Sequence, residues 1–351
     1  MEYEICLYLY YNREQKIEIL FNKVIPLLEK LDIRTYYFTT HWAHGTHISI
    51  IFEDDNIDGV DFLKRQFEKL LEEVDYRESA ELSVETVKNL IEMESYQQNA
   101  LPIYKNKTVT VSKFYIEKNS DEYISYFTQI YHKYDYKFNK FVLELLKEEQ
   151  LESNNFTNII RYLKFILSFS KNTLGEEGLK SLYISLKSHY YSFKYHPYSN
   201  LIKGYFYEFE KYYEDNSSAI KLELDLFLKQ NLFDVELIYL INSLSMEIRE
   251  INEQVPTSVK EENLRRTKQF IESSLAEKSS FHNTWINQPN IDNIIMSDEY
   301  IINRFTINYL YTLYPKLYIS PKTKHFLGYI LYRYLDENLD INWKWEGKKD
   351  D

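Results

Sequence analysis

Apolar and polar positions in the first 120 residues follow the spacing of strands in some stretches and of helices in others. Four stretches rich in β-branched and aromatic side chains are typical of strands: residues 2–11, 34–40, 47–53 and 107–117. Residues 14–31 carry apolar side chains at helical spacing, and further amphipathic stretches cover about 59–75 and 82–95. Pro26 lies inside the first helix and predicts a kink, because proline has no N–H to donate. The pattern therefore predicts a small mixed or antiparallel sheet with flanking helices.

From about residue 120 onward the apolar positions follow helical spacing. The predicted helices cover about 120–148, 155–171, 176–193, 200–213, 217–229, 233–252, 258–278, 297–313 and 321–337. Asn216 or Ser217 is predicted to be an N-cap, and the tail WKWEGKKDD is expected to fray. We therefore expect an α+β fold. Residues 1–118 would form an N-terminal α/β sheet region, and residues 119–351 a mainly helical region packed with it as one compact unit.

Composition excludes several classes of function. The net charge of −12 argues against a nucleic-acid partner, because nothing broadly basic is present to neutralise phosphates. The single cysteine, Cys6, lies in an apolar run and excludes a disulfide framework or a cysteine-rich zinc site. The N-terminus has no basic region typical of a signal peptide, and no apolar run reaches the length of a membrane span. We therefore expect a cytoplasmic protein without a membrane partner.

The segment HWAHGTH, residues 41–47, holds three of the eight histidines. Gly45 predicts a turn between two strands, and that turn would bring His41, His44 and His47 together. The chain has no HExxH motif and no cysteine pair, so we predict no metal site. Two interpretations stay open. The imidazoles line a substrate cleft and transfer protons, or they stabilise the hairpin and stack on Trp42.

The segment INRFTINYLYTLYP, residues 302–315, predicts a helix with a polar stripe. Arg304, Asn308 and Tyr311 fall at positions i, i+4 and i+7 and therefore lie on nearly one face. Such a stripe faces either a cleft or solvent. His189 lies in a tyrosine-rich helical segment, where buried packing is the simpler interpretation. No nucleophile elbow, phosphate loop or dinucleotide fingerprint is present in the sequence.

The hairpin segment THWAHGTHISIIF resembles a motif of the lantibiotic dehydratase C-terminal (elimination) domain-like family. That family includes glutamate-elimination domains of lantibiotic and thiopeptide dehydratases and the stand-alone thiopeptide pyridine synthases, or macrocyclases. The family segment commonly reads RYW-x-GG-PHLRLRF, so Trp42, Gly45 and His47 match it. The segment NRFTINYLYTL is similar to the C-terminal helix of the family, and Asn308 matches its asparagine. The order of a sheet region before a helical body also fits.

Three basic positions of the family pattern hold other residues here. The arginine that opens the motif falls on Thr40 or His41, and the arginine after PHL falls on Ser49. The histidine of the C-terminal helix falls on Phe305 or Thr306. In the elimination domains these basic residues handle the glutamyl ester and its departing carboxylate. Their absence counts against glutamate elimination and counts less against pyridine formation.

The resemblance implies a cofactor-independent pyridine synthase, a lyase-type enzyme of thiopeptide (RiPP) biosynthesis. It would join two dehydroalanines of a modified precursor peptide by a formal aza-[4+2] cycloaddition, with loss of water and leader peptide. The implied partners are the precursor peptide with its leader and the other enzymes of the biosynthetic cluster, and a homodimer stays open. Two alternatives also stay open: a glutamate-eliminating subunit of a split dehydratase, and a non-catalytic subunit that binds the precursor peptide.

The hypothesis of a pyridine synthase, together with the hairpin and the C-terminal helix, leads to a set of candidate site residues. The expected proton-transfer or orienting groups are His41, His44, His47, Tyr309 and Tyr311. The expected substrate-binding residues are Trp42, Arg304 and Asn308. His47 matches the family hairpin and is expected to be partly structural. His41 and His44 are the histidines particular to this chain.

Overall fold

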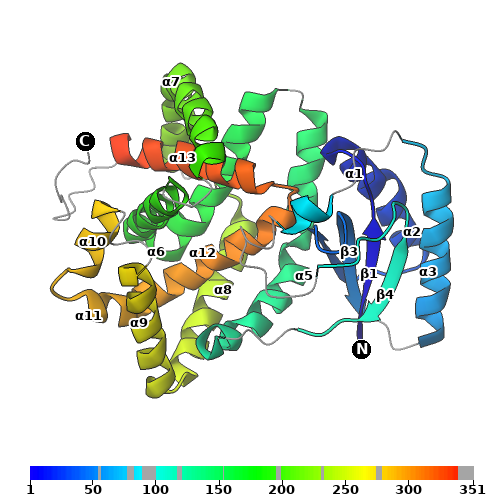
Figure 1. Ribbon diagram of the computed structural model, residues 1–351, viewed down its shortest axis with the longest axis horizontal. Helices are drawn as coiled ribbons and strands as arrows, with labels where there is room; N and C mark the ends of the chain where they lie inside the picture. Colours follow the sequence, from blue (N-terminus) through cyan, green and yellow to red (C-terminus); the bar gives the residue numbers. More distant parts are fainter. Residues whose placement is uncertain are drawn as a thin grey trace. The chain divides into compact units, whose positions relative to one another are not determined.

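The computed structural model describes residues 1–53, 57–76, 83–88, 100–116, 121–152, 154–194, 199–230, 233–273 and 279–338. These residues form two compact units (Figure 1). The first unit draws on residues 1–117, 135–151 and 313–318, and the second on residues 118–134, 152–312 and 319–351. The predicted fraying tail and most of the predicted helix 82–95 lie outside the described residues. The packing of 1–118 and 119–351 as one compact unit stays a prediction.

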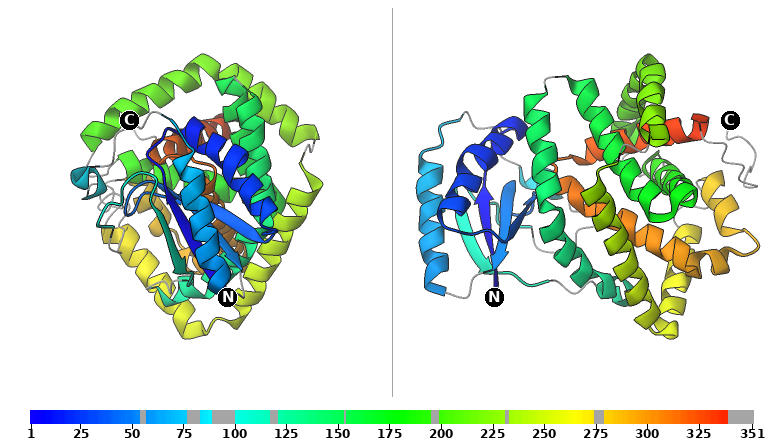
Figure 2. Two further views of the ribbon diagram at one scale, coloured as in Figure 1. Left: turned by 90° about the vertical axis from the view of Figure 1, so that its right-hand side faces the viewer. Right: turned by 180° about the vertical axis from the view of Figure 1, so that it is seen from behind.

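The first unit is built on an antiparallel sheet with the strand order β2-β3-β1-β4. Its described strands are β1 (Glu2–Tyr8), β2 (Tyr36–His41), β3 (His47–Glu53) and β4 (Val109–Lys113). Helices α1 (Arg13–Ile19), η1 (Leu20–Val24) and α2 (Ile25–Lys30) connect β1 to β2, and α3 (Ile57–Glu72) follows β3. This is the β-α-β-β-α-β order of ferredoxin-like domains. The connecting helices lie on one face of the sheet (Figure 2). The four predicted strands are confirmed: β3 has the predicted bounds, β1 and β4 are shorter, and β2 begins two residues later and ends one residue later than predicted.

The kink predicted at Pro26 takes the form of a π-helical turn. Residues Leu20–Val24 form η1, and the Ile25 N–H donates to the Leu20 carbonyl five residues back. Pro26 then lies in the first turn of α2, where a backbone N–H has no partner within the helix. The wide turn therefore lets the chain pass the proline without losing a regular helical hydrogen bond.

The two faces of the sheet differ in chemistry. Strand register places Ile5 and Leu7 of β1 beside Ile48, Ile50 and Phe52 of β3 on one face. All five side chains are fully buried. This apolar face forms the core of the first unit with the connecting helices. Its burial fixes the register, because a slip by one residue would turn every apolar side chain to the opposite face.

The second unit is helical in every described element. Its helices are α5 (Glu122–Leu151, through Tyr134), α6 (Asn155–Lys194), α7 (Ser199–Gln230), α8 (Val235–Gln254), α9 (Thr257–Ile271), α10 (Ser280–Ile286), α11 (Ile291–Met296), α12 (Asp298–Lys316, through Thr312) and α13 (Pro321–Asn338). Helix α13 packs on α6 and α7, and α10 and α11 pack beside α9. The α+β class is therefore confirmed. Within the described residues, no helix has the length and apolar character needed to cross a membrane.

The predicted helix start at Asn216 or Ser217 is wrong, because α7 runs through both residues. The Asn216 amide donates to the Tyr212 carbonyl at 2.9 Å, and the Ser217 hydroxyl donates to the Glu214 carbonyl at 3.4 Å. Both side chains therefore bond back into the preceding turn instead of capping a new one. The predicted break between 171 and 176 is confirmed as a kink in α6, where Gly175 has a φ of +62°.

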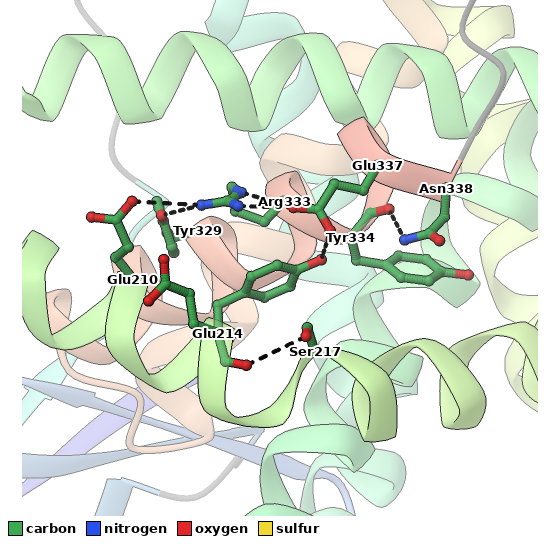
Figure 3. Close-up of polar contacts among 9 residues, drawn as sticks. Glu210, Glu214, Ser217, Tyr329, Arg333, Tyr334, Glu337 and Asn338 are labelled. Carbon is green, nitrogen blue, oxygen red and sulfur yellow. Dashed lines mark hydrogen bonds and ion pairs between the residues drawn. The ribbon is translucent and has the colours of Figure 1, made fainter.

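Polar contacts join α7 and α13 (Figure 3). The Arg333 guanidinium donates to the Tyr329 hydroxyl at 2.9 Å and to Glu337 at 2.8 Å. The Tyr213 hydroxyl of α7 donates to the other oxygen of Glu337 at 2.9 Å. Arg333 also lies 3.8 Å from the carboxylate of Glu210. Tyrosines in this interface therefore combine apolar packing with hydrogen bonds to charged groups.

Candidate functional site

The hairpin between β2 and β3 places two histidines directly opposite each other. His41 and His47 are cross-strand partners, and their ring centroids lie 5.9 Å apart. The turn between them has left-handed backbone at His44, with φ +59°, and at Gly45, with φ +112°. The Gly45 N–H closes the turn by donating to the Trp42 carbonyl at 3.0 Å. The turn predicted at Gly45 is therefore confirmed.

The segment from residue 100 to residue 104 holds the tip of this hairpin in place. The His44 N–H donates to the Ala100 carbonyl at 3.0 Å, and the Tyr104 N–H donates to the His44 carbonyl at 2.7 Å. A Cβ atom at Gly45 would overlap the hydroxyl of Tyr10, which itself donates to the Tyr104 carbonyl. Glycine is therefore required at position 45 both by its φ and by the close approach of Tyr10.

The strand register extends the histidine pair into rows across the sheet. His41 pairs with His47, and His47 pairs on its other side with Tyr8 of β1, whose ring centroid lies 4.8 Å away. The next row on the same face carries hydroxyl and thiol groups: Thr39, Ser49, Cys6 and Thr110. The polar face is the name used below for the seven residues of these two rows: His41, His47, Tyr8, Thr39, Ser49, Cys6 and Thr110. It lies opposite the apolar face because side chains alternate along each strand.

Sequence reasoning missed the β1 and β4 members of the polar face. The available signal was the alternation in EYEICLYLYY, where Cys6 and Tyr8 occupy positions of the same parity. Cys6 itself is no reactive thiol. It is buried, its sulfur lies 3.5 Å from the Ser49 hydroxyl, and burial raises its pKa to about 12.

Backbone contacts give the paired histidines different proton positions. The Ala43 N–H donates to Nδ1 of His41 at 2.9 Å, so the proton of neutral His41 is on Nε2. Nδ1 of His47 lies 2.8 Å from the Gly45 carbonyl, which only accepts, so the proton of neutral His47 is on Nδ1. His41 therefore carries an N–H donor at Nε2, and His47 carries an acceptor lone pair at Nε2.

Both imidazoles are neutral at physiological pH. Burial lowers the pKa of His41 to about 4, with a smaller contribution from His44. Burial likewise lowers the pKa of His47 to about 4; the hydrogen bond to the Gly45 carbonyl opposes this effect, and the neighbouring histidines and Lys16 add to it. Lys16 is itself desolvated, and its pKa falls to about 8. Neutral imidazoles suit hydrogen bonding and base chemistry.

His44 and Trp42 flank the pair. Nδ1 of His44 lies 3.0 Å from the Pro102 carbonyl, and its ring centroid lies 5.7 Å from that of Tyr104. The Trp42 ring is stacked on His41, with centroids 5.4 Å apart and planes inclined by 20°. The end of the hairpin is therefore an aromatic cluster with imidazole nitrogens at its centre. Within the described part of the chain, no three His, Cys, Asp or Glu side chains are placed to hold a metal ion.

The other candidate residues lie on α12, in the second unit. Arg304, Asn308 and Tyr311 are all half-buried, in keeping with their predicted common stripe. Tyr309 is fully buried, and its ring contacts Tyr131 at 5.3 Å between centroids and Tyr134 at 6.3 Å. Packing among aromatic rings therefore accounts for the position of Tyr309.

Tyr311 has a polar environment within the second unit. Its hydroxyl lies 3.4 Å from that of Ser185, and the Lys324 ammonium lies 4.6 Å from the centre of its ring. The His189 ring meets it edge-on at 5.3 Å between centroids. Burial raises the pKa of Tyr311 to about 12, with an opposing contribution from the hydrogen bond to Ser185. Tyr311 is therefore a phenol donor at neutral pH.

The positions where the family pattern has basic residues are filled by packed or bonded side chains. The Thr40 hydroxyl donates to the Pro315 carbonyl at 2.6 Å, and Ser49 is buried in the polar face. The Phe305 ring stacks on Phe127 at 3.7 Å between centroids, and Thr306 is fully buried. Thr40, Ser49, Phe305 and Thr306 therefore contribute to structure, and His41 is the alternative match for the first of these positions.

Comparison with known proteins identifies the fold. No family model matches the chain, and no curated protein matches it. The solved structure of the pyridine synthase TbtD from thiomuracin biosynthesis superimposes with a TM-score of 0.61 at 10% identity, over 96% of this chain and 98% of that chain. This chain has the TbtD fold. TsrL superimposes with a TM-score of 0.59 at 9% identity, over 96% of this chain and 95% of that chain. The resemblance predicted from Trp42, Gly45 and His47 is therefore confirmed for the fold.

Proposed function

We propose that the protein is an enzyme of thiopeptide assembly that forms a pyridine ring in a modified, leader-bearing precursor peptide. The observation that carries the proposal is the TbtD fold, which extends over 96% of this chain. Retention of the family hairpin residues Trp42, Gly45 and His47 supports it. The family pattern's two hairpin arginines and its C-terminal helix histidine have no equivalent here, which favours pyridine formation over glutamate elimination.

The proposed reaction joins two dehydroalanines through two new ring bonds. One backbone amide first becomes its iminol, whose C=N bond and adjacent alkene react with the second alkene. The resulting ring loses water and then loses the leader through its amide nitrogen, which leaves an aromatic pyridine. No oxidant is needed, because both aromatising steps are eliminations. Holding two alkenes in reactive geometry lowers the barrier by up to roughly 7–11 kcal/mol in well-oriented systems.

The histidine pair suits the tautomerisation step. An amide becomes an iminol when its nitrogen loses a proton and its oxygen gains one. Nε2 of His47 has the lone pair to accept the first proton, and Nε2 of His41 has an N–H to supply the second. Trp42, Tyr8 and Tyr104 provide flat apolar surfaces around the pair for azole rings of the peptide.

Tyr311 is proposed as a proton donor for an elimination step. Its pKa of about 12 keeps the hydroxyl protonated at neutral pH, so it donates to a departing oxygen or nitrogen. Arg304 and Asn308 share its stripe on α12 and are proposed to bind the peptide backbone. His44 is proposed to orient the substrate from the hairpin turn.

The proposal is tested with purified protein and a synthetic peptide that carries a leader, azoles and two dehydroalanines. Mass spectrometry should find a product lighter by the leader and one water, together with a new pyridine absorbance. His41→Asn keeps an acceptor for the Ala43 N–H, and His47→Asn keeps a donor for the Gly45 carbonyl. Each variant lacks Nε2, so kcat should fall roughly 10²–10⁴-fold. His132→Asn on α5 is the matched control and should retain activity.

Other outcomes would assign the alternative functions. Release of glutamate from a preformed glutamyl peptide, without pyridine formation, would identify a glutamate-eliminating subunit. Tight binding of the leader without turnover, unaffected by the histidine substitutions, would identify a subunit that only binds the precursor peptide. Either result would refute pyridine formation by this chain.

A further inference from the structure

A cleft of 160 Å³ lies between the first turn of α5 and one face of α9, inside the second unit. Asp121, Glu122 and Tyr123 line it from α5. Tyr123 forms a rigid part of this wall. It is buried, its hydroxyl donates to the Asn252 amide oxygen at 2.9 Å, and the Asn252 amide donates to Asp298 at 3.0 Å. These two hydrogen bonds hold Tyr123 in position.

The α9 wall carries unused hydrogen-bonding groups. Asn263 lines the cleft and is 8% exposed, and no other described residue forms a hydrogen bond with its amide. Helix α9 begins at Thr257 without a side-chain cap. The Val259 and Lys260 N–H groups both donate to the Pro256 carbonyl, at 3.0 and 3.2 Å. The Thr257 and Ser258 N–H groups have no partner among the described residues. A buried amide and a helix N-terminus without partners point to a ligand.

The charges of the two walls differ in sign. Arg266 lines the cleft from α9 and pairs with Glu262 through Nε at 2.7 Å, which leaves its terminal nitrogens as further donors. Glu262 also lines the cleft, and Nε and one terminal nitrogen of Arg265 each donate to it at 2.7 Å, so its negative charge is compensated. The α5 wall carries the carboxylates of Asp121 and Glu122. A bare anion would face these carboxylates, and a bare cation would face Arg266 and the positive end of the α9 dipole.

We propose that this cleft binds an α-amino acid as a zwitterion. Its carboxylate lies against the Arg266 guanidinium and the first N–H groups of α9. Its ammonium lies against Asp121 and Glu122, and the Asn263 amide completes the hydrogen bonding. A ligand with both charged groups attached to one carbon atom satisfies both walls at once, which neither ion alone does. The inference is independent of the proposed function, because its residues are separate from the polar face and from the α12 stripe.

Isothermal titration calorimetry of the full chain tests the proposal with glycine and L-glutamate as probes. Acetate, methylammonium and N-acetylglycinamide serve as probes that lack one or both charges. We expect saturable binding of an amino acid and at least roughly tenfold weaker binding of the three comparison probes. The absence of saturable amino-acid binding up to about 10 mM would overturn the inference. Equal affinity for acetate, methylammonium or the neutral amide would also overturn it.

Two neighbouring arginines provide a matched comparison. Arg266→Gln removes the guanidinium that lines the cleft, and affinity should fall roughly tenfold or more. Arg265→Gln removes a guanidinium that binds the same Glu262 but does not line the cleft, and affinity should fall less than in Arg266→Gln. Glu122→Gln changes an exposed residue and should weaken amino-acid binding without altering the fold. Unchanged affinity in both Arg266→Gln and Glu122→Gln would refute the assignment.

Discussion

Acidification should destabilise the hairpin through its two buried histidines. In the folded protein the pKa values of His41 and His47 are lowered to about 4, whereas an unfolded histidine titrates at about 6.5. Between these values the unfolded chain binds more protons than the folded chain, so the free energy of unfolding rises with pH. The stabilisation that depends on neutral imidazoles is therefore complete above about pH 6.5 and is lost as pH falls toward about 4. Below about pH 4 the two histidines cause no further change in the free energy of unfolding.

The magnitude follows from the size of the shift. A shift of about 2.5 pH units corresponds to about 3 kcal/mol for each imidazole. For His47 this applies nearly in full, since its side chain is only 7% exposed, whereas the half-buried His41 contributes less. The sum is a large fraction of the 5–15 kcal/mol that typically separates folded from unfolded states. A moderate acid shift should therefore have a measurable effect.

Urea unfolding between pH 4 and 7, followed by tryptophan fluorescence, measures this effect. Carboxylates also titrate in this range, so the informative quantity is the difference between the wild type and His47→Asn. The wild type should lose about 3 kcal/mol more than the variant between pH 7 and 4. His282 is a buried histidine outside the hairpin, and burial lowers its pKa to about 4 as well. His282→Asn therefore serves as the comparison for removing a buried histidine elsewhere in the chain. Parallel stability curves for the wild type and His47→Asn would refute the assignment of a neutral, desolvated His47.

Three further predictions concern the first unit. Gly45→Ala should lower the free energy of unfolding by roughly 2 kcal/mol or more, and Tyr10→Phe in the same chain should restore part of it, as measured by urea unfolding. Lys316→Met should cost about 3–5 kcal/mol, because it removes a buried ammonium that lies 2.7 Å from the Asp135 carboxylate and so breaks a mostly buried ion pair. The double variant Lys316→Met with Asp135→Leu should recover most of that loss, and an additive loss would contradict a direct ion pair. Cys6 should react with a thiol reagent only after denaturation, and fast labelling of the folded protein would contradict its burial and its pKa of about 12.

Most of the secondary structure could be predicted because it depends on local patterns. Residues 2–8 and 47–53 form strands, as their sequence pattern predicts. The later segments with helical spacing form helices. Errors arose where the local pattern did not show how far a helix continues or which helix packs beside it. Asn216 has the chemistry of an N-cap, yet its amide bonds back to Tyr212 because α7 continues. The short helices α10 and α11 went unpredicted, since packing beside α9 supports them more than their own spacing does.

The same distinction applies to the candidate site. The sequence by itself determined the hairpin, because a short turn with Gly45 between two strands sets His41 opposite His47. Only the tertiary structure decided that Tyr8 joins this row, since pairing of β1 with β3 connects segments far apart in the chain. It also decided the proton positions and the lowered pKa values of the imidazoles. Those depend on carbonyls and on exclusion of water, which form only when the sheet and its surroundings are folded.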